Sequence, residues 1–260
     1  MLKNELLRKI QAGERTVGTF FGAGNASVAE AIGLAGLDYI IIDAEHGPFE
    51  AEGALDILRG AELGGTTALV RVKDGSRAAV LKMLDIGARG LIVPCMHSAE
   101  EIRQVVSYAK YFPLGNRGVA QARGAGFGAG EVAKQSLEGY FRDCNEGTLI
   151  IPQCETRGCL DQIEEVCAID GVAGIFIGPF DLSCALGAPA VFDSQEFKDA
   201  LVRIRDAAHA AGKFCIMFTT DPSAAPGWFE KGYDSVTVGM EYNHIIAAFR
   251  QLEAAAKGKT

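Results

Sequence analysis

Side chains that could do acid–base or metal chemistry stand at the ends of short apolar runs in this sequence. In chain order they are Asp43, Glu45, His46, Arg71, Gln153, Glu155, Asp181 and Asp221. Carboxylates bind hard divalent cations, an imidazole moves protons near neutral pH, and a guanidinium stabilises oxyanions. These side chains can act together only if the fold brings the ends of the runs to one place.

Glu155 and Asp181 form a candidate metal site because they follow two successive runs. Two carboxylates can hold a divalent cation and still leave coordination positions for substrate and water. The alternative is a pair of solvated or capping acids, with Asp181 at the N-cap of the short helix that follows it.

His46 is one of four histidines and lies among acids, which makes it a candidate general base; the alternative is a structural histidine. Arg71 lies inside an apolar run, and a buried guanidinium must be paired. It is either one half of a structural salt bridge or a donor aimed at an oxyanion. A base, a buried cation and two carboxylates together suit enolate chemistry beside a carbonyl.

The sequence gives less evidence for a functional role of the other three histidines. His97 follows the fourth run and could line the pocket, whereas His209 lies near the end of a predicted helix and is expected on the surface. His244 begins the last predicted helix and is given no role.

Alternating strands and helices are the elements that would position these residues. Apolar, β-branched runs of strand length occur at 16–21, 39–43, 68–72, 90–94, 148–153, 174–178, 214–219 and 235–239. Such continuous runs indicate strands buried on both faces, as in parallel sheets. Helical periodicity covers 51–63, 98–108, 194–211 and 242–256, and Ser98 with Glu101 has the spacing of a capping box.

Eight strands that alternate with helices in about 250 residues predict an α/β fold, a (β/α)8 TIM barrel, as a single domain over 1–260. A doubly wound sheet is the alternative, but no G-x-G-x-x-G turn follows the first run. Barrel enzymes place their chemistry at the carboxyl ends of the strands. Two long connections, 112–147 and 179–193, are expected at that same face.

Composition narrows the function classes. The net charge is −8, from 25 basic and 33 acidic residues, without the basic stripe of a nucleic-acid binder. No apolar run is long enough to cross a membrane, and charges interrupt the first 14 residues, unlike a signal peptide. The seven cysteines form no C-x-x-C pair, which favours free thiols in a reducing compartment. The protein is predicted to be cytoplasmic, with a small-molecule substrate and neither nucleic acid nor membrane as partner.

Six segments carry a family resemblance: IIIDAEHGPFE, LVRV, LKMLDIGARGLIVPCMHSAEE, GNRGVAQAR, IIPQCET and GIFIGPFDLSCALG. In this order they resemble the HpcH/HpaI aldolases, which are metal-dependent (class II) pyruvate aldolases, over nearly all the chain. The resemblance implies a TIM barrel, a homohexamer built as a trimer of dimers, and a C-terminal helix exchanged between subunits. It also implies aldol cleavage or condensation of 4-hydroxy-2-oxo acids, to or from pyruvate and an aldehyde, through a metal-stabilised pyruvate enolate.

The resemblance also implies roles for residues. Glu155 and Asp181 would bind Mg²⁺, Mn²⁺ or Co²⁺, which pyruvate would chelate through its keto and carboxylate oxygens. Gln153 and the backbone at Phe180 and Asp181 would help to hold pyruvate. His46 would act as the base through a metal-bound water.

Two further roles follow from the same resemblance. Arg71 would stabilise the enolate, and Asp85, in the LDIGA segment, would raise the basicity of the histidine. The chain departs from the family pattern at Phe180, where a small residue is usual, and at VGMEYNH and RGAGFGAG. These departures leave the acceptor aldehyde open. The substrate that releases it would be 4-hydroxy-2-oxoheptanedioate, 2-dehydro-3-deoxyglucarate or a related sugar acid.

Three alternatives compete with this function. A Schiff-base aldolase needs a lysine inside the barrel, but the sixth run has none, and Lys73 and Lys213 are poorly placed. An oxaloacetate decarboxylase or an acyl-CoA ester lyase would use related chemistry in the same superfamily. A non-catalytic barrel would have no need of the acids, the histidine and the arginine that are all present.

Overall fold

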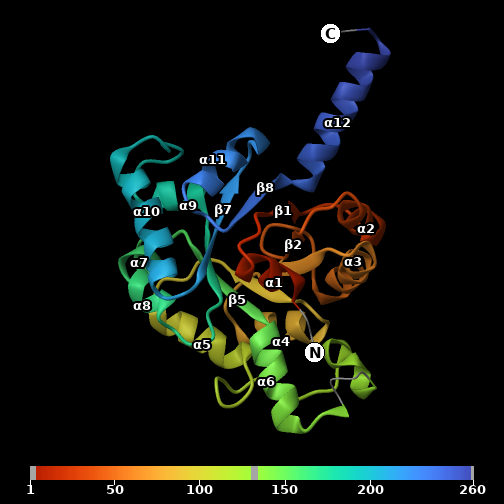
Figure 1. Cartoon of the computed structure of the whole chain (residues 1–260), viewed down its shortest axis with the longest axis vertical. Helices are drawn as coiled ribbons and strands as arrows, with labels where there is room; N and C mark the ends of the chain where they lie inside the picture. Colours follow the sequence, from red (N-terminus) through yellow and green to blue (C-terminus); the bar gives the residue numbers. More distant parts are fainter. Residues whose placement is uncertain (1–3, 130–133, 259–260) are drawn as a thin grey trace.

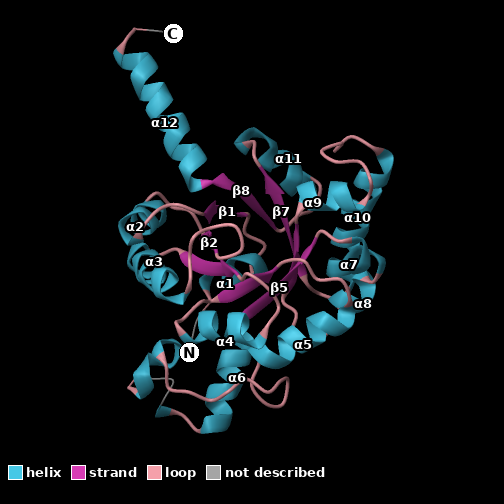
Figure 2. Ribbon diagram, turned by 180° about the vertical axis from the view of Figure 1, so that it is seen from behind, coloured by secondary structure: helices cyan, strands magenta, loops and turns pink. Residues whose placement is uncertain are grey.

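A closed barrel of parallel strands forms the centre of the computed structural model, which describes residues 4–129 and 134–258. The strands follow one another in chain order, and the last pairs with the first (Figure 2). They are β1 (Thr16–Phe21), β2 (Tyr39–Asp43), β3 (Thr67–Arg71), β4 (Gly90–Val93), β5 (Leu149–Cys154), β6 (Gly174–Ile177), β7 (Phe214–Thr219) and β8 (Ser235–Met240). The predicted (β/α)8 barrel is confirmed, and the ends of each strand lie within one residue of the predicted run.

Helices surround the barrel on the outside (Figure 1). They are α1 (Glu5–Gln11), α2 (Ala26–Leu34), α3 (Ala51–Gly64), α4 (Arg77–Asp85), α5 (Ala99–Ala109), α6 (Leu137–Gly147), α7 (Arg157–Asp161), α8 (Ile163–Cys167), α9 (Pro179–Ala185), α10 (Gln195–Ala210), α11 (Ala225–Glu230) and α12 (Glu241–Ala256). Among the described residues there are also two 3-10 segments, η1 (Arg123–Gly128) and η3 (Pro222–Ala224). The four predicted helices are confirmed, and the side chain of Ser98 caps α5 by accepting the Glu101 backbone N–H. None of the described helices is long and apolar enough to span a membrane.

The barrel interior is filled by side chains from alternate strand positions, as expected for a sheet with a period of two. Its buried members are Leu6, Phe20, Tyr39, Ile41, Leu69, Ile92, Leu149, Ile151, Phe176, Phe214 and Ile216. Leu6 belongs to α1, so this short helix closes the amino end of the barrel. The polar strand ends therefore lie at the opposite, carboxyl end.

The described parts of the connection, 112–129 and 134–147, lead from the end of α5 to the start of β5 at the amino end of the barrel, so the predicted place of this connection at the carboxyl face was wrong. It follows a helix rather than a strand, and α5 has already returned the chain to the amino end. There Arg117 donates to Asp85, the last residue of α4, at 3.0 Å, and Arg123 donates to the Ile86 carbonyl at 2.9 Å. The connection over 179–193 follows β6 directly and begins at the carboxyl face, as predicted.

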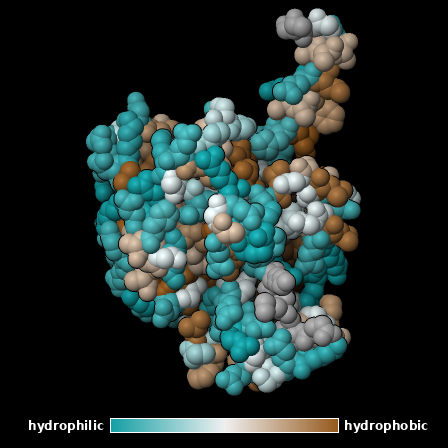
Figure 3. Space-filling model, in the orientation of Figure 1, coloured by the Kyte–Doolittle hydropathy of each residue, from teal (hydrophilic) through white to brown (hydrophobic). Residues whose placement is uncertain are grey.

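The helix α12 leaves the barrel after its first turn and projects into solvent (Figure 1). Its first residue, Glu241, is 2% exposed and accepts backbone N–H groups from all three residues of 22–24. The large apolar side chains beyond it are between 38% and 65% exposed: Tyr242, Ile245, Ile246, Phe249 and Leu252. Apolar side chains are visible along this projecting helix in Figure 3. Their spacing is that of one apolar helix face, which this chain leaves uncovered.

Candidate active site

A buried ion pair joins the carboxyl ends of β2 and β3. Asp43 and Arg71 stand opposite each other in the strand register. Arg71 donates from Nε and Nη2 to the two carboxylate oxygens of Asp43, at 3.0 and 2.7 Å. Asp43 is 1% exposed and Arg71 9%. The salt bridge that was one of the two interpretations of Arg71 is therefore present.

The guanidinium of Arg71 has two further neighbours. Its Nη1 lies 3.1 Å from Oε2 of Glu45, and its carbon lies 4.6 Å from the centre of the Phe20 ring. A guanidinium carries five N–H groups, and Asp43 uses only two of them. Arg71 is thus held rigidly and still has hydrogens to offer a substrate oxygen.

The turn after β2 fixes His46 at the mouth of the barrel. Asp43 Oδ1 accepts the backbone N–H groups of Glu45 and His46, at 3.1 and 3.2 Å. Gly47 passes so close that an added Cβ would lie 2.1 Å from the Asp43 carbonyl oxygen, so only glycine fits there. His46 itself is exposed, and its ring makes no hydrogen bond or ion pair with the described residues. It can therefore meet a substrate from solvent.

Glu155 is a buried carboxylate at the end of β5 that lacks a cationic partner. It is 4% exposed, its Oε1 accepts the Cys95 N–H at 2.8 Å, and its Oε2 accepts the Gln153 amide. It forms no ion pair with a described lysine, arginine or histidine. Burial raises its pKa, and the negative charges of Glu45 and Asp181 raise it further.

Asp181 comes close enough to Glu155 to influence it because the end of β6 approaches β5 tightly. A Cβ on Gly178 would lie 2.6 Å from Glu155 Oε2, so this approach requires glycine. Asp181 lies exposed in the first turn of α9. The N-cap of that helix is Gly178, with no side-chain capping bond, so the alternative role of Asp181 as a cap is contradicted.

These oxygens fit a hard divalent cation. Gln153 is 2% exposed and its Oε1 has no hydrogen-bond partner, which leaves a buried acceptor beside two carboxylates. An all-oxygen donor set of this kind suits Mg²⁺ or Mn²⁺. No three His, Cys, Asp or Glu side chains of the described chain gather closely enough to enclose an ion. A bound ion would therefore keep positions for water and substrate, as Mg²⁺ usually does.

Cys95 was not singled out from the sequence, yet it links two of the acids. Its backbone has a φ of 56°, unusual for a residue with a side chain, and this turns its N–H toward Glu155. Its thiol donates to Glu45 Oε1 at 3.6 Å. Burial and the two carboxylates raise its pKa to about 11, so the thiol stays protonated near neutral pH. Its place directly after β4 and Pro94 is a signal that could have identified it.

The structure does not bring Asp85 to His46. Asp85 ends α4 at the amino end of the barrel, where its carboxylate pairs with Arg117 at 3.0 Å. Phe180 does lie at the mouth, 47% exposed, with its ring edge-on against Phe192 at 5.1 Å. The role predicted for Asp85 is therefore unsupported within one chain, whereas Phe180 is placed to shape the approach of a substrate.

Three of the four remaining candidates have local partners. Asp221, after β7, accepts the backbone N–H of Ser223, and the ring of His97 has no bond to the described residues. His209 is on the surface, as predicted, and pairs with Asp234 at 2.9 Å. His244 lies 2.9 Å from the Val238 carbonyl oxygen, a contact that fixes the start of α12.

Comparison with known proteins gives concordant matches. The family model described as HpcH/HpaI aldolase/citrate lyase matches residues 16–248. The chain is 32% identical to a hydroxypyruvate/pyruvate aldolase of Agrobacterium fabrum, over 98% of this chain and 94% of that one. It is 31% identical to a 2-keto-3-deoxy-L-rhamnonate aldolase of Klebsiella pneumoniae, over 100% of this chain and 98% of that one. An HpcH/HpaI aldolase/citrate lyase family protein of Burkholderia cenocepacia superposes with a TM-score of 0.89 at 29% identity, over 98% of this chain and 100% of that one.

Proposed function

The chain belongs to the HpcH/HpaI aldolase/citrate lyase family and is a carbon–carbon lyase, and we propose that it cleaves 4-hydroxy-2-oxo acids to pyruvate and an aldehyde. It would also catalyse the reverse condensation, and it would use a divalent cation in both directions. The observation that carries this proposal is Glu155, a buried carboxylate without a cationic partner at the mouth of the barrel. The unpaired oxygen of Gln153 lies beside it, and Arg71 and His46 lie at the ends of β3 and β2, at the same mouth.

Four residues would bind the cation and pyruvate. Glu155 and Asp181 would hold Mg²⁺, Mn²⁺ or Co²⁺, which when bound supplies a Lewis acid for a keto oxygen. Gln153 and the first-turn N–H groups at Phe180 and Asp181 would orient the pyruvate carboxylate, because the first N–H groups of a helix have no partner inside it. At this mouth the negative charges of the acids exceed the positive charge of Arg71, which favours the entry of a cation.

Two residues would handle the reacting atoms. In the direction of condensation, His46 would take a proton from the methyl group of pyruvate, directly or through a water. The free hydrogens of Arg71 would stabilise the negative charge that develops on the keto oxygen. Asp43 holds Arg71 for this task through two hydrogen bonds.

A substrate panel tests the proposal. With Mn²⁺ or Mg²⁺ present, the protein should release pyruvate from at least one of 2-keto-3-deoxy-L-rhamnonate, 4-hydroxy-2-oxoheptanedioate and 2-dehydro-3-deoxyglucarate, measured by coupling to lactate dehydrogenase. Chelation should stop the release, and added metal should restore it. Activity on oxaloacetate alone would favour a decarboxylase instead. Trapping of pyruvate by borohydride would favour the Schiff-base alternative, although Lys73 is 53% exposed and Lys213 borders the amino end of β7.

Replacing Arg71 by lysine should lower kcat by about 10²- to 10³-fold, the cost of one lost oxyanion donor. Lysine keeps the charge but loses the planar fork that holds Asp43 and a substrate oxygen at once. Steady-state kinetics on the best substrate of the panel measure the effect. Arg59→Lys, on an exposed arginine of α3 paired with Asp56, is the matched control and should leave kcat unchanged. An unchanged kcat in Arg71→Lys with only a lower melting temperature would leave Arg71 a purely structural role.

Assembly and location form part of the same proposal. The uncovered apolar face of α12 supports packing against a second copy, as in a hexamer built from dimers with exchanged C-terminal helices. All seven cysteines are free thiols, which is the state favoured in the cytoplasm.

A further inference from the structure

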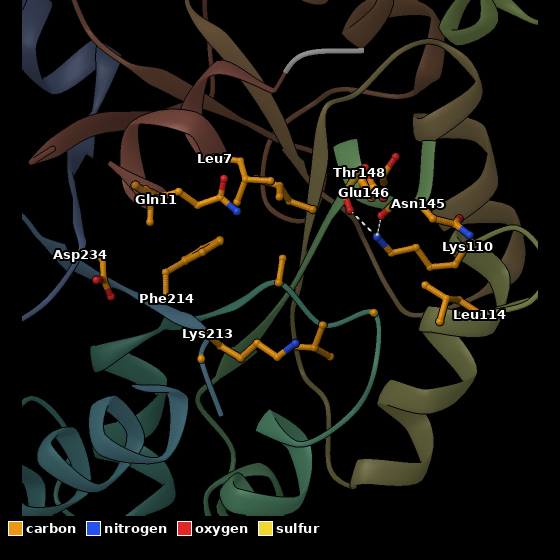
Figure 4. Close-up of a pocket in the computed structure, with 16 residues that line it drawn as sticks. Leu7, Gln11, Lys110, Leu114, Asn145, Glu146, Thr148, Lys213, Phe214 and Asp234 are labelled. Carbon is orange, nitrogen blue, oxygen red and sulfur yellow. Dashed lines mark hydrogen bonds between the residues drawn. The ribbon is translucent and has the colours of Figure 1, made fainter. Parts of the chain in front are cut away.

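A hollow lies at the amino end of the barrel, opposite the candidate active site. Its volume is about 450 Å³, within the usual range of ligand pockets. It lies between α1, the end of α5, the end of α6 and the start of β7 (Figure 4). Leu7, Ile10 and Phe214 line it with apolar surface, and Lys110 and Lys213 bring two positive charges to it.

Lys110 carries a buried charge that is only partly compensated. The residue is 3% exposed, and its Nζ donates to the carbonyl oxygens of Asn145 and Thr148, both at 2.5 Å. These carbonyls belong to the end of α6, where the helix dipole is negative, so the contacts offset part of the charge. An ammonium has three hydrogens, however, and the third is left for another acceptor. Burial, as the largest cause, and the nearby charges of Lys213 and Arg117 together lower the pKa of Lys110 to about 8.

Lys213 approaches the same space from the other side. It precedes β7, and its side chain extends toward the side on which Lys110 enters (Figure 4). Neither lysine forms an ion pair within the described chain. Two acids, Asp234 and Glu146, also line the hollow, but Asp234 binds the Cys215 N–H and His209, and neither acid forms an ion pair with Lys110 or Lys213 in the described chain. The two lysines therefore face one hollow without a direct anionic partner.

We propose that this hollow binds a small organic dianion, a phosphate ester or a dicarboxylate. Its anionic group would lie between Lys110 and Lys213, and its carbon atoms would lie against Leu7, Ile10 and Phe214. A dianion matches two ammonium groups, whereas a monoanion would leave one charge unpaired. The strands and the inner core separate this position from the acids at the mouth, so its occupant is distinct from the substrate.

Inorganic phosphate and succinate are the probes that test the site. Both are titrated into metal-free protein at constant ionic strength, and the melting temperature is followed. We expect a saturable rise with at least one of them. A rise with phosphate alone supports a phosphate ester, and a rise with succinate alone supports a dicarboxylate. Lys213→Gln should weaken the apparent affinity by about 10- to 100-fold, the loss of one hydrogen bond to a charged group.

Two further variants complete the design. Lys198→Gln, on an exposed lysine of α10, is the matched control and should keep the wild-type affinity. Lys110→Met should also lose binding. This variant additionally removes the bonds of Lys110 to the end of α6, so the conclusion is drawn from Lys213→Gln instead. The wild-type Lys213 side chain makes no bond in the described chain. Three results would overturn the proposal: no saturable rise with either probe, an equal rise in Lys213→Gln, or a rise that Glu155→Gln abolishes and Lys213→Gln does not.

Discussion

Glu155→Gln should lose at least about 10³-fold in kcat/KM, because the several kcal/mol that a Lewis acid supplies would go with the metal. Glutamine keeps the size of the side chain, and its amide oxygen can still accept the Cys95 N–H. The fold should therefore survive. Steady-state kinetics across a range of Mn²⁺ concentrations, together with direct measurement of metal binding, check the expectation. Asp181→Asn should show a loss in the same direction.

The melting temperature gives this variant a second readout. A carboxyl group whose pKa is raised on folding destabilises the folded state at pH values above that pKa, and the effect fades as the pH falls. Burial and neighbouring acids raise the pKa of Glu155, so metal-free Glu155→Gln should be as stable as the wild type at neutral pH, or more stable. Added Mn²⁺ should raise the melting temperature of the wild type and leave that of the variant unchanged.

The matched control for this pair is Asp221→Asn. Asp221 also follows a barrel strand, but its carboxylate binds only its own turn through Ser223. Its removal should leave metal binding and activity near those of the wild type. If Glu155→Gln kept wild-type activity, before and after chelation, the metal-dependent mechanism would be wrong.

The barrel could be predicted from sequence because its signal is local. A strand buried on both faces is a continuous apolar run, and the residue that ends the run marks the functional face. That logic placed Asp43, Arg71, Gln153 and Glu155 correctly at one mouth. It also identified Arg71 as a buried, paired cation, although not Asp43 as its partner.

The parts that escaped prediction depend on geometry that is not local. The length of the connection over 112–147 does not indicate its face, because the face depends on whether a strand or a helix precedes it, and here the preceding element is α5. Cys95 donates its backbone N–H to Glu155 because its φ is positive. The residue type alone does not indicate such a backbone conformation. Asp85 lies in a family segment, but its partner, Arg117, comes from a distant connection. Pairing of that kind is visible only in three dimensions.

His46→Ala should abolish the exchange of pyruvate methyl protons in deuterated water, with a loss of about 10²- to 10⁴-fold for a missing general base. The assay needs no aldehyde, so the unknown acceptor does not affect it. The ring of His46 makes no bond to the described chain, so its removal should leave the fold unchanged. Binding of pyruvate and metal should also persist. Nuclear magnetic resonance of the methyl signal measures the rate, which in the wild type should depend on metal.

His97→Ala is the matched control for this experiment, since His97 is also exposed and follows a strand of the same mouth. It should exchange at the wild-type rate. If His46→Ala also exchanged at that rate, another group would be the base. Asp43 would be a poor substitute, because both of its oxygens are bound to Arg71. Glu45 would be the better one, because burial raises its pKa and only one of its carboxylate oxygens, Oε2, lies against Arg71, at 3.1 Å. Glu45→Gln would then be the variant that decides which side chain removes the proton.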